Sequence, residues 1–456
     1  MNKSTLAIAV AVGLLAQQAS AAGFIEDSKA TLKLRNFYIN NDNRDSGTKA
    51  AGAQSKVEEW GQGFQLDFTS GFTQGTVGFG VDAIGLLGVK LDSSAGKHGN
   101  PTGANSGGSV FPSDGNHAVD DFSSLGLTAK AKVSQTELRI GTLQPKLPVI
   151  VTNDGRMLPQ TFQGGQITSS EFKDLTFTGG QIEHAKGRNS SNNEGLSIAG
   201  ANAGSNYAKG EFVNKFYYGG ADYKVNKDLL LQYYYGNLED FYKQHFLGLV
   251  HNWSIGPGVL KSDLRYFNSS DDGKNGHDSA YYTTGDYANS SIGSGKGKVD
   301  NNLISGLFLY TVEGHTFGGG YQVSNGSSDF PFLNQGDGAS AYIPTDMQIS
   351  KFARAGERTW QARYSYDFAK VGVPGLTAGA VYLRGNNIDT YNSKNVQTSN
   401  GSSEWERDIT VAYVIQEGAL KNLGLTWKNA MWRNDIASQR DQDENRLIVS
   451  YSIPLL

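Results

Sequence analysis

Apolar residues recur at every second position in many segments of this chain, and this alternation restricts the fold more than any other feature. In residues 125–133 the odd positions are all apolar, while the even positions are Gly126, Thr128, Lys130 and Lys132. The same pattern returns in residues 60–68, 259–267, 302–310, 359–368 and 446–456. A period of two is that of a β-strand with one apolar and one polar face. The sequence therefore predicts an all-β protein.

Short and long polar connections alternate between these segments. The long ones are residues 92–122, 188–211, 268–299, 324–358 and 387–404. Bacterial outer-membrane barrels have short periplasmic turns and long extracellular loops. We count about 18 segments, which predicts a transmembrane antiparallel β-barrel that forms a single domain over residues 22–456.

A soluble sandwich or solenoid would also alternate, with its apolar faces meeting in a core. Tyrosine and tryptophan decide between the two folds. They gather near segment ends, as in residues 216–223 and 233–235 and at Trp360 and Trp427. Aromatic girdles at the two interfaces are typical of a membrane barrel.

The first 21 residues have the pattern of a secretory signal peptide. Lys3 precedes an apolar run from Leu6 to Leu15, and Ala19 and Ala21 have the spacing of a cleavage site after Ala21. The run is too short for a membrane anchor. The chain has no cysteine, so no disulfide is expected. A net charge of −4 argues against nucleic-acid binding. We expect a protein of the bacterial outer membrane, in contact with its lipid and lipopolysaccharide.

Basic residues occupy the polar positions of several strands, so they would face the barrel interior. A lysine or arginine on the lipid face costs about 2–4 kcal/mol at the membrane midplane. The predicted inward cations are Lys130, Lys132, Arg139, Lys261, Arg265, Arg363, Lys428 and Arg446. The predicted inward acids are Glu59, Asp67, Asp82, Asp263, Asp367, Glu406 and Asp408. An 18-stranded barrel encloses water, and such charges either orient a small anion or zwitterion or merely solvate the wall.

Several segments resemble the OprD-type outer-membrane carboxylate channels of Gram-negative bacteria. They are residues 23–28, 34–40, 70–92, 158–172, 360–377 and 446–451, so the resemblance covers the mature chain. It implies an 18-stranded barrel, monomeric or loosely associated as a homo-oligomer, whose long extracellular loops fold into the lumen and form a constriction. It also implies a ladder of basic side chains that passes small carboxylates down the pore.

Carried over by position, residues 151–160 and 327–352 correspond to the two constricting loops. Arg156 would project into the eyelet, and Arg188 and Arg35 would lie beside it. Members that transport basic amino acids and small peptides carry an aspartate where this chain has Ala339, although Asp337 is close, and an arginine where it has Val381. The resemblance therefore favours cyclic or aromatic carboxylates as substrates, with basic amino acids as the alternative.

Other chemistry is weakly indicated. The seven histidines lack metal-binding spacing and no cysteine is present, so we expect no metal site and no cofactor. Residues 268–278 are rich in oxygen ligands but lack the terminal glutamate of a calcium loop. No G-x-S-x-G motif occurs, and we expect that the protein is not an enzyme. A barrel with hydrolase activity and a loop-plugged structural barrel remain as alternatives.

Overall fold

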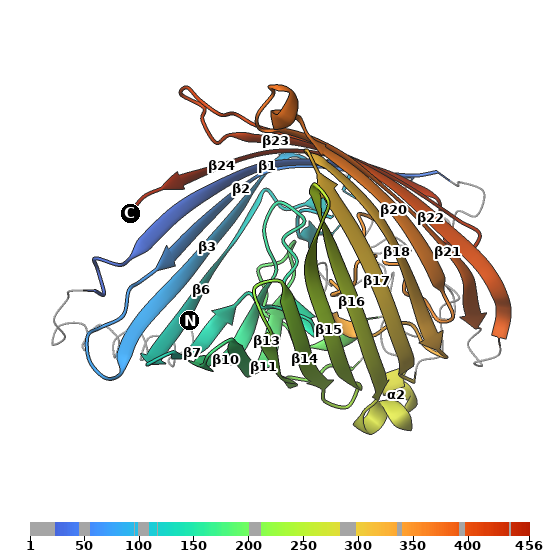
Figure 1. Ribbon diagram of the computed structural model, residues 1–456, viewed down its shortest axis with the longest axis horizontal. Coiled ribbons are helices and arrows are strands. Elements are labelled where there is room, and N and C mark those ends of the chain that lie inside the picture. Colours follow the sequence, from blue (N-terminus) through green and yellow to red (C-terminus); the bar gives the residue numbers. More distant parts are fainter. Residues whose placement is uncertain are drawn as a thin grey trace.

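A computed structural model describes residues 23–44, 55–94, 96–98, 109–115, 117–199, 211–282, 298–334, 340–391, 397–436 and 439–456. Within these residues an 18-stranded antiparallel sheet closes on itself where β1 pairs with β24 (Figure 1). The predicted all-β barrel of about 18 strands is confirmed. The predicted signal peptide, residues 1–21, lies outside the described residues.

The barrel strands follow one another along the chain with antiparallel pairing throughout. They are β1 (Lys29–Asn43), β2 (Lys56–Thr69), β3 (Gly78–Asp92), β6 (Asp121–Val133), β7 (Thr136–Leu143), β10 (Thr161–Phe172), β11 (Leu175–Lys186), β13 (Phe216–Lys224), β14 (Leu229–Leu238), β15 (Tyr242–Ile255), β16 (Gly258–Asp271), β17 (Asp300–Val312), β18 (His315–Gly326), β20 (Arg358–Asp367), β21 (Leu376–Tyr391), β22 (Gln397–Val414), β23 (Gly424–Asn434) and β24 (Gln442–Pro454).

Short elements occupy the connections. They are β4 (Ser113–Asp114), β5 (His117–Ala118), β8 (Lys146–Leu147), β9 (Ile150–Val151), β12 (Ser197–Ala199), β19 (Phe332–Asn334), the 3-10 helices η1 (Gly273–Gly276) and η2 (Phe368–Val371), and the α-helix α2 (Ser279–Tyr282). In the part of the chain that the structure describes, no helix is both long and apolar enough to cross a membrane.

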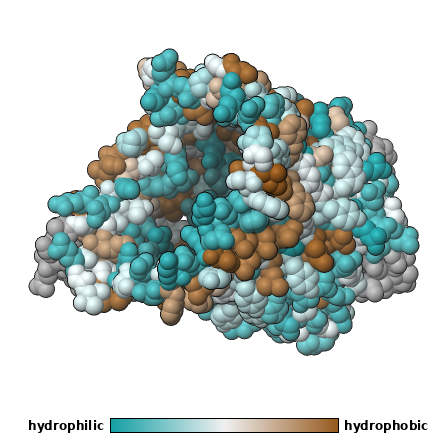
Figure 2. All heavy atoms as spheres, viewed as in Figure 1, coloured by the Kyte–Doolittle hydropathy of each residue, from teal (hydrophilic) through white to brown (hydrophobic). Residues whose placement is uncertain are grey.

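The strand faces follow the alternation in the sequence. Leu125 is 72% exposed on the outside of β6, whereas Lys130 on the same strand is 4% exposed and faces inward. On β20, Trp360 is 42% exposed and its neighbour Gln361 only 3%. Apolar side chains therefore cover the outer surface, and polar ones line the interior. Figure 2 shows a recess in the molecule with mainly hydrophilic residues around it.

The short turns, the start of the first barrel strand and the end of the last one all lie at the same end of the barrel. The start of β1 pairs with the last residues of β2 and β24. The turn between β17 and β18 is two residues long, and both Glu313 (φ 48°) and Gly314 (φ 85°) have the left-handed backbone that tight hairpins require. In outer-membrane barrels such short turns mark the periplasmic end.

One predicted loop is mostly strand. Residues 387–404 were expected to form a long insert, but β21 continues to Tyr391 and β22 begins at Gln397, where the two residues pair. Beyond the hydrocarbon layer a strand no longer needs one apolar face, so the period-two signal that identifies a strand is lost there.

Two long connections fold into the lumen. We call residues 144–160, between β7 and β10, loop A, and the described residues 327–334 and 340–357, between β18 and β20, loop B. Both pack in one apolar cluster with the barrel wall, and its members include Val149, Ile150, Phe246, Phe267, Phe330 and Phe332. A second cluster joins Met157 and Leu158 of loop A to Phe37 and Ile39 of β1. This packing positions the polar tip of loop A, which we define as residues 153–156, inside the barrel.

Candidate functional site

The tip of loop A is bound by an arginine of the barrel wall. Arg35 on β1 donates from Nη1 to Asp154 Oδ1 (2.7 Å) and from Nη2 to Asp154 Oδ2 (3.1 Å). Its Nη1 also donates to the carbonyl oxygen of Arg156 at 2.6 Å. A planar guanidinium opposite a carboxylate forms the strong bidentate arrangement. Arg35 thus sits at the constriction, engaged with the loop.

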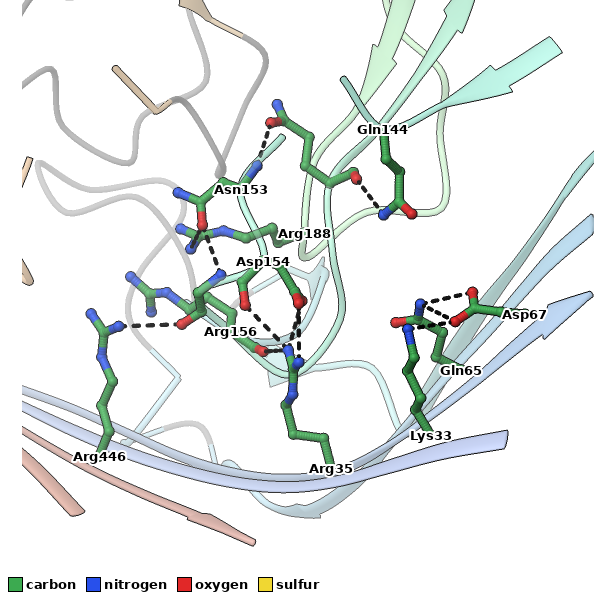
Figure 3. Close-up of polar contacts among 12 residues, drawn as sticks. Lys33, Arg35, Gln65, Asp67, Gln144, Asn153, Asp154, Arg156, Arg188 and Arg446 are labelled. Atoms are coloured by element: carbon green, nitrogen blue, oxygen red, sulfur yellow. Dashed lines mark hydrogen bonds and ion pairs between the residues drawn. The ribbon is translucent and has the colours of Figure 1, made fainter. Parts of the chain in front are cut away.

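Two further arginines approach the same tip from other directions (Figure 3). Arg188, which follows β11, donates from Nη1 to Asn153 Oδ1 at 3.0 Å. Arg446 of β24 donates to the carbonyl oxygens of Gly155 (3.2 Å) and Gln348 (3.1 Å), so it contacts loop A and loop B together. A Cβ on Gly155 would lie 3.3 Å from Arg188 Nη1 and 4.0 Å from Arg446 Nη1. The glycine therefore keeps the space between these two cations open.

Arg156 differs from its neighbours. Its Nε and Nη1 atoms are buried, and no residue in the described part of the chain accepts a hydrogen bond from them. Burying a charged donor without an acceptor is costly. At the tip of loop A, Arg156 therefore carries guanidinium donors that the described residues leave without an acceptor.

A cavity of about 460 Å³ adjoins the constriction and contains the next cations. Arg363 of β20 donates from Nε to Gln361 Oε1 at 2.7 Å and also to the carbonyl oxygen of Pro344 in loop B. Lys428 of β23 is the direct cross-strand partner of Arg446. Asp408 and Val381 line the same cavity. Val381 is the position where the sequence resemblance implies an arginine in members that transport basic amino acids.

Three predicted cations lie on another part of the wall. Lys130 Nζ contacts Asp82 Oδ1 and the carbonyl oxygen of Ser70, each at 2.7 Å. Arg139 contacts Glu137 at 2.5 Å and Asp82 at 3.4 Å, beside a second cavity of about 470 Å³. Lys132 is exposed near the turn, over the ring of Phe72. Within the described residues, no hydrogen bond or ion pair joins any of these three to the tip of loop A.

Arg265 holds loop B. It forms a bidentate pair with Asp263 on its own strand (2.8 and 2.7 Å). Its guanidinium also lies 4.0 Å above the ring of Tyr342 and donates to the carbonyl oxygen of that residue. Arg265 therefore contacts loop B at Tyr342, and among the described residues no hydrogen bond joins it to the tip of loop A.

A row of carboxylates on β22 was only partly recognised from the sequence. Glu406 accepts from the backbone N–H groups of Ile349 (2.9 Å) and Ser350 (2.7 Å), and Asp408 accepts from that of Gln348 (3.3 Å). Glu404 accepts from Ser350 Oγ at 2.7 Å. The spacing of the acids at positions 404, 406 and 408 predicts that they point inward. No feature of the sequence identifies the loop that they bind.

Some predicted positions cannot be compared with the structure, because Ala339 and Asp337 lie outside the described residues. In residues 268–278, Lys274 Nζ contacts Asp240 Oδ2 at 3.1 Å, and no group of three metal-binding side chains occurs in the described ranges.

Lys33, which the sequence reasoning missed, pairs with Asp67 at 2.7 Å. It shares the inward face of β1 with Arg35, and that parity could have identified it.

A closed barrel whose lumen is narrowed by two infolded loops, with arginines at the narrowing, defines an outer-membrane porin. Residues 22–455 match the family model described as outer membrane porin, OprD family. The chain belongs to the OprD family of outer-membrane porins, and the resemblance seen in its sequence is confirmed.

Individual relatives cover nearly the whole chain. It is 37% identical to the porin-like protein GalP of Pseudomonas putida, over 99% of this chain and 97% of that protein. Among solved structures, Pseudomonas aeruginosa OccK8 (OprE) is 61% identical with a TM-score of 0.82, over 95% of this chain and 100% of that one. Pseudomonas aeruginosa OpdK, solved with vanillate, is 34% identical with a TM-score of 0.79, over the same shares.

Proposed function

We propose that this porin admits small solutes that bear a carboxylate, with cyclic or aromatic acids favoured over basic amino acids. The observation that carries the proposal is Arg156, whose two buried guanidinium nitrogens lack a protein acceptor at the constriction. A carboxylate is the group that matches a guanidinium in charge and geometry.

The charge around Arg156 supports an anion rather than a cation. Arg188 and Arg446 reach the same tip, and the acid on the tip, Asp154, is already engaged by Arg35. A solute ammonium would meet mostly guanidinium groups. The vanillate in the OpdK structure is an aromatic carboxylate, which agrees with this class.

Beyond the tip, the cavity with Arg363 and Lys428 offers the carboxylate its next partners. Arg446 lines this cavity while it also contacts loop A. A solute can therefore exchange one cationic partner for another without crossing an uncharged region. Such exchange keeps binding weak enough for release, which conduction requires.

The test is the flux of matched solutes through protein reconstituted in liposomes. We expect Arg156→Gln to lower benzoate flux about tenfold while benzamide flux changes little, because a hydrogen bond to a charged group contributes about 1.5–3 kcal/mol and 1.4 kcal/mol is a factor of ten. Arg384→Gln, at an exposed position of β21, is the matched control. Equal loss of both fluxes would contradict the proposal, and a larger flux of arginine than of benzoate would favour the basic amino-acid alternative.

A further inference from the structure

Three side chains from separate segments meet at the end of the barrel opposite the short turns. They are Glu59 of β2, His98 in the connection after β3, and Ser113 of β4. His98 Nδ1 lies 2.7 Å from Glu59 Oε1, and His98 Nε2 lies 2.8 Å from Ser113 Oγ. Glu59 and His98 are fully buried, whereas Ser113 is exposed. A hydroxyl, an imidazole and a carboxylate in this order have the geometry of a nucleophile, its base and the group that orients the base.

The surroundings of Glu59 set the tautomer of His98. The carboxylate accepts from Ser93 Oγ at 2.9 Å and from the backbone N–H of Val110 at 2.7 Å. Because both carboxyl oxygens already accept hydrogen bonds, we assign the proton of the shared hydrogen bond to His98 Nδ1. Nε2 then carries a lone pair directed at the Ser113 hydroxyl, which is the arrangement that a general base requires.

The position of Ser113 suits a solute that arrives from outside. The residue belongs to the short β4–β5 hairpin, in the connection between β3 and β6. Two residues before it, Phe111 packs in the same cluster as Met157 of loop A. The segment that leads into the hairpin thus packs against loop A, and the serine at the start of the hairpin is exposed.

We propose that Glu59, His98 and Ser113 form a hydrolytic site for small carboxylic esters at the outer end of the pore. Ser113 and His98 are the catalytic residues, and Glu59 is a positioning residue. The carboxylic acid released there belongs to the class that the pore is proposed to admit. The hydrolysis itself does not depend on that transport.

The reaction balances with water as the sole co-reactant. Ser113 Oγ bonds to the ester carbonyl carbon while its proton passes to His98 Nε2. The bond from carbon to the alcohol oxygen breaks, and that oxygen takes the proton from His98. Water then attacks the acyl group on Ser113 and gives a proton to His98, which returns it to Ser113 Oγ as the carboxylic acid leaves.

The experiment uses the full barrel in detergent, a fluorophosphonate probe that labels activated serines, and p-nitrophenyl acetate. We expect the probe on Ser113, located by mass spectrometry, and ester hydrolysis that Ser113→Ala abolishes. His98→Gln should slow labelling at least about a hundredfold, because a positioned general base contributes roughly that factor or more. Glu59→Gln should also slow it, and Glu59→Asp should restore part of the rate.

Matched controls separate this site from general effects on the protein. Ser94 is an exposed serine of the same connection whose carbonyl oxygen accepts from the His98 N–H, and Ser94→Ala should label as the wild type does. Benzoate flux through Ser113→Ala should equal that of the wild type, so failure of the esterase leaves the transport proposal intact. Absence of probe on Ser113, or equal labelling in His98→Gln, overturns the inference.

Discussion

The Arg35 guanidinium and the Asp154 carboxylate form a bidentate pair, with Nη1 to Oδ1 at 2.7 Å and Nη2 to Oδ2 at 3.1 Å. The pair joins β1 to the tip of loop A. A further hydrogen bond, from Arg35 to the Arg156 carbonyl oxygen, joins the same two segments. Arg35 therefore neutralises the acid on the tip and fixes the backbone on both sides of Gly155. The wall thereby positions the segment that presents Arg156.

We predict that Arg35→Gln loosens the tip without unfolding the barrel. The Asp154 side chain is 49% exposed, and such pairs contribute only about 0–1 kcal/mol to stability. The released tip and the unpaired Asp154 carboxylate should increase open-channel current noise and lower the preference for anions over cations. Single-channel recordings and reversal potentials in planar bilayers measure both effects.

The control is Lys33→Gln, which removes a cation from the same face of β1 that pairs with Asp67 instead of loop A. It should leave the current noise unchanged. If the two variants have equal noise, the Arg35 contacts do not hold the tip.

A second prediction concerns Gly155. A Cβ there would lie 3.0 Å from Asn153 Oδ1 and 3.3 Å from Arg188 Nη1, which is tight contact. We expect Gly155→Val to displace Arg188, to lower single-channel conductance and to reduce benzoate flux more than benzamide flux. Gly401→Val is the control, because a Cβ at Gly401 meets no atom within 4 Å. Unchanged conductance in Gly155→Val would show that the space beside Gly155 is not on the solute path.

The alternation in the sequence predicts the direction of a side chain but not its partner. It predicts that Lys130, Arg363 and Arg446 face the interior. On a strand with a period of two, the residues between the lipid-facing ones must point inward. It does not predict that Lys130 shares Asp82 with Arg139, because diagonal contacts depend on the register between strands.

The constriction is harder to predict for a similar reason. Loops A and B have no periodicity, and their place in the lumen came from the family resemblance. The contact of Arg446 with Gln348 joins residues 98 positions apart. Such contacts follow from the packing of the two loops in one apolar cluster. Only the folded structure reveals this packing.

A third prediction tests the acids of β22 as the attachment of loop B. Glu406→Ala removes the acceptor of the Ile349 and Ser350 N–H groups, and an unsatisfied buried donor costs about 1–3 kcal/mol. Loop B should therefore leave the wall at least about tenfold more often. We expect frequent transitions to a higher conductance in single-channel records. Glu417→Ala, in an exposed periplasmic turn, should behave as the wild type, and similar records for both variants would exclude the attachment.

The last prediction concerns pH and Glu357 of loop B, which accepts from the Arg354 N–H at 2.9 Å. Burial, together with the neighbouring Glu404, raises the pKa of Glu357 well above its ordinary value. A raised pKa in the folded protein means that the folded state retains a proton which the detached loop would release. The stabilisation is fully present below the ordinary glutamate pKa and is lost as the pH rises through the raised one.

Glu357→Gln replaces the protonated acid with a group of similar shape that cannot ionise. We therefore expect loop B to be attached equally well in the variant and the wild type at acidic pH, and better in the variant as the pH increases. The measurement is the frequency of high-conductance transitions across a pH series for both proteins. Parallel curves would show that Glu357 takes no proton on attachment, whereas a difference that grows with pH assigns the proton to this carboxyl.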